Sequence, residues 1–139
     1  MKVIFYTVKT ASAKVHYLLQ TGSHHFAQKE KIQIIVPDRK ALTFIDELFW
    51  SQPKESFLPH CISSPLPFHD LLYICLAEEA LDDFSFVFNL TPAPYTPHPR
   101  VKVLYELEDC THPDKKALFQ TKFKLYQSLG HTLSNGSLS

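Results

Sequence analysis

The residues with the clearest capacity for chemistry lie between positions 60 and 70, where His60-Cys61 and His69-Asp70 occur. A thiol near an imidazole could form a nucleophile, and two histidines with a carboxylate could bind a metal ion. The chain contains eight histidines but no HExxH or CxxC spacing. We therefore expect surface histidines, a buried thiol and no metal. A small hydrolase or transferase that uses these four residues is kept as an alternative.

Phosphate-binding loops are the next chemistry to consider, and they depend on glycine. The chain has only three glycines, Gly22, Gly130 and Gly136, and none follows the first apolar segment. Dinucleotide fingerprints and P-loops need backbone freedom that glycine supplies at little cost. The sequence therefore predicts no nucleotide site and no cofactor.

A candidate binding surface lies on the helix predicted from about 114 to 129. One flank of this helix presents residues at i, i+4, i+7 and i+11, namely Lys116, Gln120, Phe123 and Gln127. Lys124 stands a little further round. A lysine, an aromatic ring and amides on one flank suit a peptide that is both anionic and apolar, such as an acidic tail ending in Phe. The alternative is an ordinary solvated flank, because basic residues near helix ends also complement the dipole.

This flank lies at one edge of the helix's apolar face, which is predicted to face the core. Its apolar residues are Leu118, Phe119, Leu125, Tyr126 and Leu129. Lys115 and Lys122 fall near the middle of this face, so we expect them to extend past it towards solvent, or the helix to begin later.

The helix predicted from about 39 to 50, with Asp38 as its N-cap, ends at the chain's single tryptophan. Its core stripe is Ala41, Leu42, Ile45, Leu48 and Phe49. Trp50 lies about 150° from the centre of that stripe. Either the helix ends early and the ring folds back, or the indole is partly exposed. It is either a lid on the core below the Pro53 turn or an aromatic wall for a partner.

The elements that would position these residues alternate along the chain. Strands are predicted at 2–8, 31–36, 84–90 and 101–107, and helices at 12–29, 39–50 and 114–129, with Gly130 closing the last. The first helix is expected to kink or divide near Gly22, and 71–76 is a short strand or a helical turn. This alternation favours an α/β domain with a mainly parallel sheet over residues 1–130. Residues 131–139 are expected to form a polar, frayed tail.

Composition limits the class of function. The chain has 139 residues with 14 basic and 14 acidic side chains, so its formal net charge is zero. Proteins that bind nucleic acid tightly through phosphates usually carry excess positive charge, so direct DNA or RNA binding is not expected. No apolar run reaches the length of a membrane helix. Three widely spaced cysteines, Cys61, Cys75 and Cys110, indicate reduced thiols and a cytoplasmic location.

The segment 45–60, IDELFWSQPKESFLPH, matches in order and spacing the block LDxxLWxxPxxSFxPH. That block is typical of the chi subunit of bacterial DNA polymerase III, a clamp-loader accessory protein, and the chain resembles this family. Supporting matches, which extend the resemblance over most of the chain, are Phe5-Tyr6, Phe88-Asn89-Leu90 and Lys124-Leu125-Tyr126 before Gly130.

The resemblance implies a non-enzymatic adaptor with a Rossmann-like three-layer α/β/α fold. Members of the family bind the acidic C-terminal tail of single-stranded DNA-binding protein, and a small psi subunit that joins them to the clamp loader, so DNA is reached only indirectly. The family's tail pocket maps onto Phe57, Lys116, Phe123 and Lys124. Gln120 replaces a basic residue of that pocket, which Lys122 is expected to compensate, and Gln127 replaces a residue that is often basic.

A third hypothesis, besides the tail-binding adaptor and the small hydrolase or transferase, has the same fold but no tail binding. In it, the chain is a subunit that only packs against a partner, through Trp50 and the proline-rich segment 91–99.

Overall fold

The computed structural model describes residues 1–51, 60–62, 72–96 and 99–136. These residues form a seven-stranded parallel sheet in the order β3-β4-β2-β5-β6-β1-β7. The strands are β1 (Lys2–Val8), β2 (Ile32–Val36), β3 (His60–Ile62), β4 (Leu72–Leu76), β5 (Phe86–Asn89), β6 (Val103–Asp109) and β7 (Thr132–Asn135). The helices are α1 (Ala11–Ala27), α2 (Arg39–Ser51), α3 (Pro113–Ser128) and the short 3-10 helix η1 (Ala77–Glu79).

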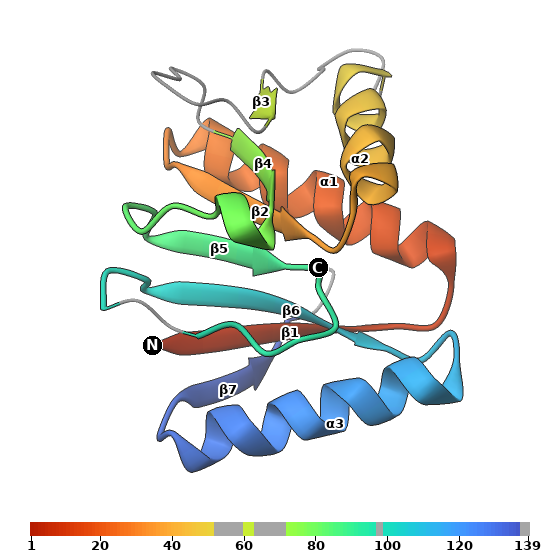
Figure 1. Ribbon diagram of the computed structural model, residues 1–139, viewed down its shortest axis with the longest axis vertical. Helices are drawn as coiled ribbons and strands as arrows, with labels where there is room; N and C mark the ends of the chain where they lie inside the picture. The colour runs from red at the N-terminus through yellow and green to blue at the C-terminus, as the bar shows by residue number, and fades with distance from the viewer. Residues whose placement is uncertain (52–59, 63–71, 97–98, 137–139) are drawn as a thin grey trace.

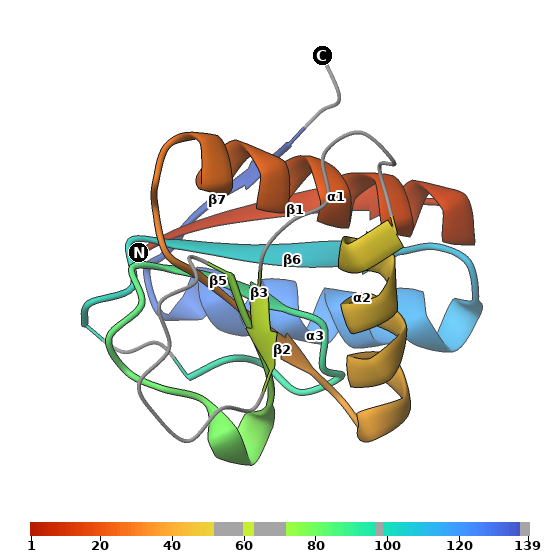
Figure 2. The same cartoon turned by 90° about the horizontal axis from the view of Figure 1, so that it is seen from above.

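The sheet separates two layers. Alternate residues of β2, β4 and β5 pack with Leu18 of α1 and with Leu42, Ile45 and Phe49 of α2 in one core cluster. The other sheet face packs with Tyr126 of α3 in a second cluster. Figure 2 shows α1 on one side of β1 and β6 and α3 on the other. The predicted Rossmann-like three-layer α/β/α architecture is therefore confirmed.

The two ends of the sheet carry different helices (Figure 1). α3 runs beside β6 and β7, whereas α2 stands at the other end, where it contacts β3 and β4. A residue on α3 and a residue at the end of α2 therefore belong to separate regions of the surface. None of the described helices is both long and apolar enough to cross a bilayer.

Local chemistry explains the helix boundaries. The Asp38 carboxylate accepts a hydrogen bond of 2.8 Å from the Ala41 amide, which confirms the predicted N-cap of α2. Gly130 adopts φ +82° directly after α3, a conformation that glycine takes without the penalty of a Cβ. The helix α1 runs unbroken through Gly22, so the predicted division there is wrong. Residues 72–76 are a strand, not a helical turn.

The end of the chain differs from the prediction. Residues 131–139 are expected to be frayed, but Thr132–Asn135 forms β7, which pairs in parallel with β1 from Lys2 to Phe5. The Gly136 amide also donates a 2.8 Å hydrogen bond to the Phe5 carbonyl. A polar four-residue sequence has little strand propensity of its own, and here the free edge of β1 supplies the hydrogen-bond partners.

Candidate binding surfaces around α3

The orientation of α3 is set by a buried ion pair. Lys122 is 6% exposed, and its Nζ lies 2.9 Å from Oε1 of Glu106, a fully buried residue of β6. The same Nζ donates a 2.6 Å hydrogen bond to the carbonyl of Thr91. Lys122 therefore faces the sheet and not solvent. The sequence predicts that Lys122 extends past the apolar face to solvent and compensates for Gln120 on the outer flank, and both predictions are wrong.

Further hydrogen bonds complete this network. Glu106 Oε2 accepts from the Tyr126 hydroxyl at 2.7 Å and from Asn89 Nδ2 at 2.9 Å. The Tyr126 hydroxyl in turn accepts from the Tyr95 amide at 2.8 Å. Burial raises the pKa of the Glu106 carboxyl, and the Lys122 ammonium and the hydrogen bonds from Tyr126, Lys122 and Asn89 act against that rise. The network joins β5, β6, α3 and the segment after β5 into one unit.

The prediction of which residues form the buried face of α3 is largely wrong. Phe119 and Tyr126 are buried, but the three leucines of the predicted face, Leu118, Leu125 and Leu129, are 44%, 40% and 54% exposed. The buried stripe is Phe119, Lys122 and Tyr126, at i, i+3 and i+7. A search for apolar periodicity scores lysine as a surface residue and misses this stripe. The available signal was Glu106, an acid within the strand predicted at 101–107.

The predicted polar flank of α3 does lie on the surface. Lys116, Gln120, Lys124 and Gln127 are all exposed, and Phe123 is half-buried between them and the sheet. The Phe123 ring meets Phe5 of β1 edge-on, with centroids 5.7 Å apart, and lies 6.0 Å from Phe119. The flank thus combines two lysines with the open side of an aromatic cluster whose other side is anchored in the sheet.

The other predicted site residues, Phe57 and Trp50, are not part of α3. Phe57 lies outside the described residues. Trp50 is 52% exposed, which is the second of its two alternatives, and its Nε1 donates to Asp46 at 3.1 Å. Of the proposed binding residues, the described ones on α3 are therefore together, while Trp50 belongs to a separate surface.

The rival catalytic residues receive no support. His60 and Cys61 belong to β3, while His69 and Asp70 lie outside the described residues. In the part of the chain that the structure describes, no three His, Cys, Asp or Glu side chains gather as a metal would require. Burial raises the pKa of the Cys75 thiol to about 12, so this cysteine remains a protonated core residue.

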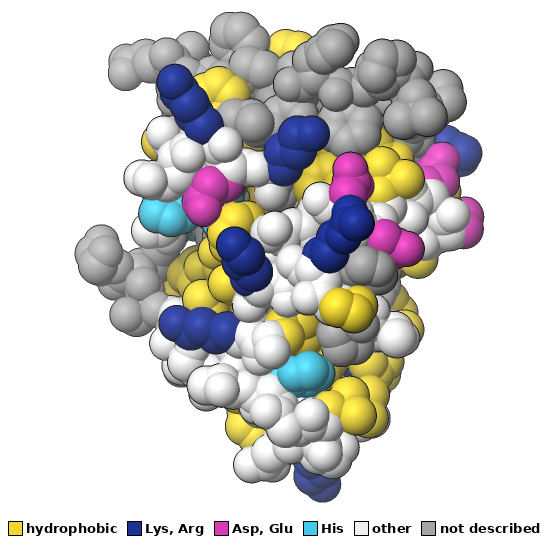
Figure 3. All heavy atoms as spheres, turned by 90° about the vertical axis from the view of Figure 1, so that its left-hand side faces the viewer, with side chains coloured by type: hydrophobic (Ala, Val, Ile, Leu, Met, Phe, Trp, Pro, Cys, Tyr) yellow, Lys and Arg dark blue, Asp and Glu magenta, His cyan; other side chains and the backbone are white. Residues whose placement is uncertain are grey.

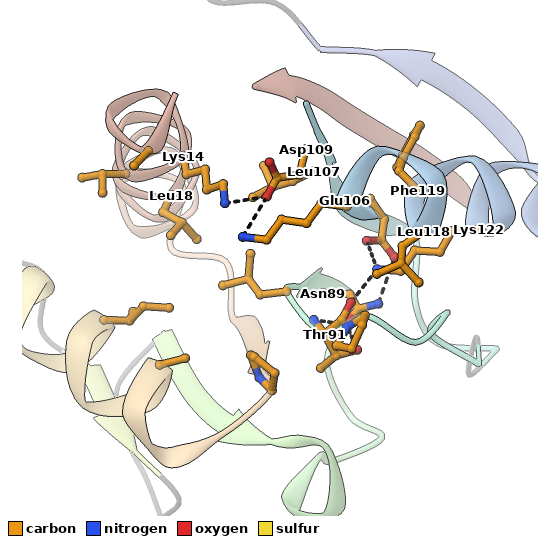
Figure 4. Close-up of a pocket in the computed structure, with 18 of the residues that line it drawn as sticks. Lys14, Leu18, Asn89, Thr91, Glu106, Leu107, Asp109, Leu118, Phe119 and Lys122 are labelled. Atoms are coloured by element: carbon orange, nitrogen blue, oxygen red, sulfur yellow. Dashed lines mark hydrogen bonds and ion pairs between the residues drawn. The ribbon is translucent and has the colours of Figure 1, made fainter. Parts of the chain in front are cut away.

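A cleft of about 590 Å³ opens at the carboxyl ends of the strands (Figure 4). Its apolar walls come from Leu18 of α1, Phe44 of α2 and Leu118 of α3. Glu106 and Lys122 also line it, as an ion pair without net charge. On its rim, Asp109 Oδ2 lies 2.5 Å from Lys14 Nζ and 3.8 Å from Lys115 Nζ. The sequence did not indicate this cleft, because its walls come from three helices that are distant in the chain.

A buried histidine links α1 to the sheet. His25 is 1% exposed, its Nε2 lies 2.7 Å from the Tyr105 hydroxyl, and its Nδ1 lies 3.2 Å from Glu30 Oε1. Burial lowers the pKa of His25, although Glu30 opposes this shift. The folded protein therefore holds the imidazole in its neutral form more strongly than the unfolded chain does.

Because of His25, we expect the free energy of unfolding to decrease as the pH is lowered. Below its ordinary pKa of about 6.5 the unfolded chain takes up a proton that the folded state resists, so the free energy of unfolding decreases as pH falls. The slope is at most about 1.4 kcal/mol per pH unit for this one group. Urea unfolding at several pH values from 7.5 to 5.5 measures it. The slope should flatten in His25→Gln and persist in a control, His16→Gln, at an exposed position. An unchanged slope in His25→Gln would contradict the assignment.

The fold and sequence together define a class: a parallel α/β protein with no glycine-rich phosphate loop in its sequence and with candidate binding surfaces around its last helix. The chain belongs to the family described as DNA polymerase III chi subunit, HolC, whose family model matches residues 1–134. This family consists of non-catalytic accessory subunits of the replicative polymerase. A search of curated protein sequences returns no significant match.

Proposed function

We propose that this accessory subunit links the clamp loader to single-stranded DNA-binding protein by binding the acidic C-terminal tail of that protein. The observation that carries the proposal is the flank of α3, where Lys116, Lys124 and Gln120 are exposed around the half-buried ring of Phe123. The psi subunit and the clamp-loader complex are the further partners, and the exposed Trp50 offers a separate apolar surface for such a contact. This role belongs to the cytoplasm.

The chemistry of the flank fits a chain end that is both acidic and aromatic. The terminal phenylalanine of the tail would pack on the open side of Phe123, whose other side is held by Phe5 and Phe119. Lys116 would pair with the terminal carboxylate or with a neighbouring acid, and Lys124 would attract the tail at longer range. Because both lysines are exposed, each pair contributes about 1 kcal/mol or less. Gln120 would offer a neutral amide where the family pocket is basic.

Indirect contact with DNA agrees with the distribution of charge. The chain has no net charge, and on the face shown in Figure 3 the Lys and Arg side chains are scattered among acidic and uncharged ones. On this face, the described residues form no continuous basic patch of the kind that holds phosphates. Binding the tail would place the subunit at single-stranded DNA without such a patch.

Two substitutions on the flank test the proposal. We expect Lys116→Glu to weaken tail binding about five- to tenfold, because it replaces an attraction with a repulsion. Phe123→Ala should weaken it about tenfold or more, because it removes the aromatic surface. Fluorescence anisotropy with a labelled tail peptide measures both.

Matched controls separate the flank from general effects. Lys102→Glu changes net charge by the same amount at an exposed site before β6 and should bind like the wild type. Thermal unfolding shows whether Phe123→Ala remains folded, and Phe123→Leu, which keeps apolar volume, should retain more affinity than Phe123→Ala. Unchanged tail affinity in both Lys116→Glu and Phe123→Ala would rule this surface out.

A further inference from the structure

The cleft at the carboxyl ends of the strands lies where ligands bind in open parallel sheets. The neighbouring strands β1 and β6 are followed by helices on opposite faces, α1 after β1 and α3 after β6 (Figure 2). The divergence of these helices leaves a crevice at the strand ends, which is the usual position of a ligand in such folds. The cleft of about 590 Å³ is within the usual size for a small-molecule site.

The walls of the cleft are apolar and partly open to solvent. Leu18 and Ile45 are buried within it, whereas Phe44 and Leu118 are 54% and 44% exposed on different helices. Large apolar side chains that line one concave surface favour a hydrophobic occupant, because its binding removes their surface from water.

Among the described residues, the charge of the lining is positive by one unit. Three lysines, Lys14, Lys115 and Lys122, line the cleft with two acids, Glu106 and Asp109. Lys122 is paired with Glu106 in the buried network, so the excess lies on the rim, where Lys14 and Lys115 share the Asp109 carboxylate. Lys14 holds the shorter contact, and the Lys115 side chain is 54% exposed. Lys115 is thus the cation best placed to meet an incoming anion.

We propose that this cleft binds a small hydrophobic carboxylate, of the fatty-acid or aryl-carboxylate class. The apolar body lies between Leu18, Phe44 and Leu118, and the carboxylate pairs with Lys115 at the rim. The cleft and the polar flank lie on different sides of α3, since Lys115 and Leu118 line the cleft while Lys116, Gln120 and Lys124 do not. The inference is therefore independent of tail binding.

Titration calorimetry with decanoate, decanol and the full-length protein tests the chemical class. Decanoate should bind at one site, and decanol, which has a hydroxyl in place of the carboxylate, should bind at least tenfold more weakly. Lys115→Ala should weaken decanoate about five- to tenfold and leave decanol unchanged. Equal affinity for decanoate and decanol would overturn the role of the rim lysines, and absence of decanoate binding would overturn the proposal.

Two matched pairs of variants locate the site. Leu118→Asp should weaken decanoate binding at least tenfold, whereas Leu129→Asp, at another exposed leucine that does not line the cleft, should not. Likewise Lys116→Glu should leave decanoate binding intact while it weakens tail binding. Equal losses in Leu118→Asp and Leu129→Asp would mean nonspecific adsorption and would overturn the site.

The tail peptide distinguishes the two proposals. It should bind the decanoate-saturated protein as well as the free protein, and Lys115→Ala should not reduce its affinity. Competition between decanoate and the tail peptide would show that the cleft is part of a peptide site, and would overturn the small-molecule assignment. Loss of tail binding alone leaves the decanoate result standing, so the two failures can be told apart.

Discussion

Replacing Lys122 with methionine is expected to lower the free energy of unfolding by about 3–5 kcal/mol. The substitution keeps an apolar chain of similar length but leaves the Glu106 carboxylate buried without its cation. It also leaves the Thr91 carbonyl without its 2.6 Å hydrogen bond from Nζ. Urea unfolding at neutral pH measures the loss.

The double variant Glu106→Gln/Lys122→Met identifies the cause. Removing both charges should recover much of the stability lost in Lys122→Met, because the cost comes from the unpaired carboxylate and not from the missing pair. Lys124→Met, at an exposed position two residues along α3, should change stability by less than about 0.5 kcal/mol. A loss below about 1 kcal/mol in Lys122→Met would contradict the buried network.

The second large effect is expected at the end of α2, where adjacent aromatic residues have opposite environments. Phe49 is fully buried, so Phe49→Ala should cost about 3–5 kcal/mol through lost burial and a cavity in the core. Trp50 is 52% exposed, so Trp50→Ala should cost less than about 1 kcal/mol despite removing a larger side chain.

Circular dichroism during urea unfolding compares the two variants, because Trp50 is the chain's single tryptophan and its fluorescence is lost in Trp50→Ala. A cost above about 2 kcal/mol for Trp50→Ala would show that the indole supports the core. With a small cost, Trp50→Ala becomes a suitable variant for partner-binding assays, since its effects would then reflect the surface and not the fold.

The Lys122–Glu106 pair has a consequence for function. It turns Phe119 and Tyr126 towards the sheet, which leaves Lys116 and Lys124 on one side of α3 and the exposed leucines on the other. The proposed tail-binding flank and the proposed carboxylate cleft therefore both depend on this rotation. Variants that break the pair are expected to disturb both surfaces, so binding tests should use substitutions outside the network.

Local patterns in the sequence determined most of the architecture. Runs of β-branched and aromatic residues predicted β1, β2, β5 and β6, and Asp38 predicted the start of α2, because these features act through neighbouring backbone and through periodic burial. The block at 45–60 indicated the family, which the match over residues 1–134 confirms. Helical geometry placed Trp50 away from the core stripe and left two alternatives open, a ring folded back on the core or an exposed indole, and the structure has the exposed indole.

The tertiary structure alone decided the rotation of α3, the strand β7 and the cleft. A lysine is buried only when a partner from another element compensates its charge, and Glu106 on β6 is that partner. β7 forms because the edge of β1 is free, and the cleft exists because α1, α2 and α3 border one crevice at the strand ends. Each depends on contacts between residues far apart in the chain, which the periodicity of one segment does not encode.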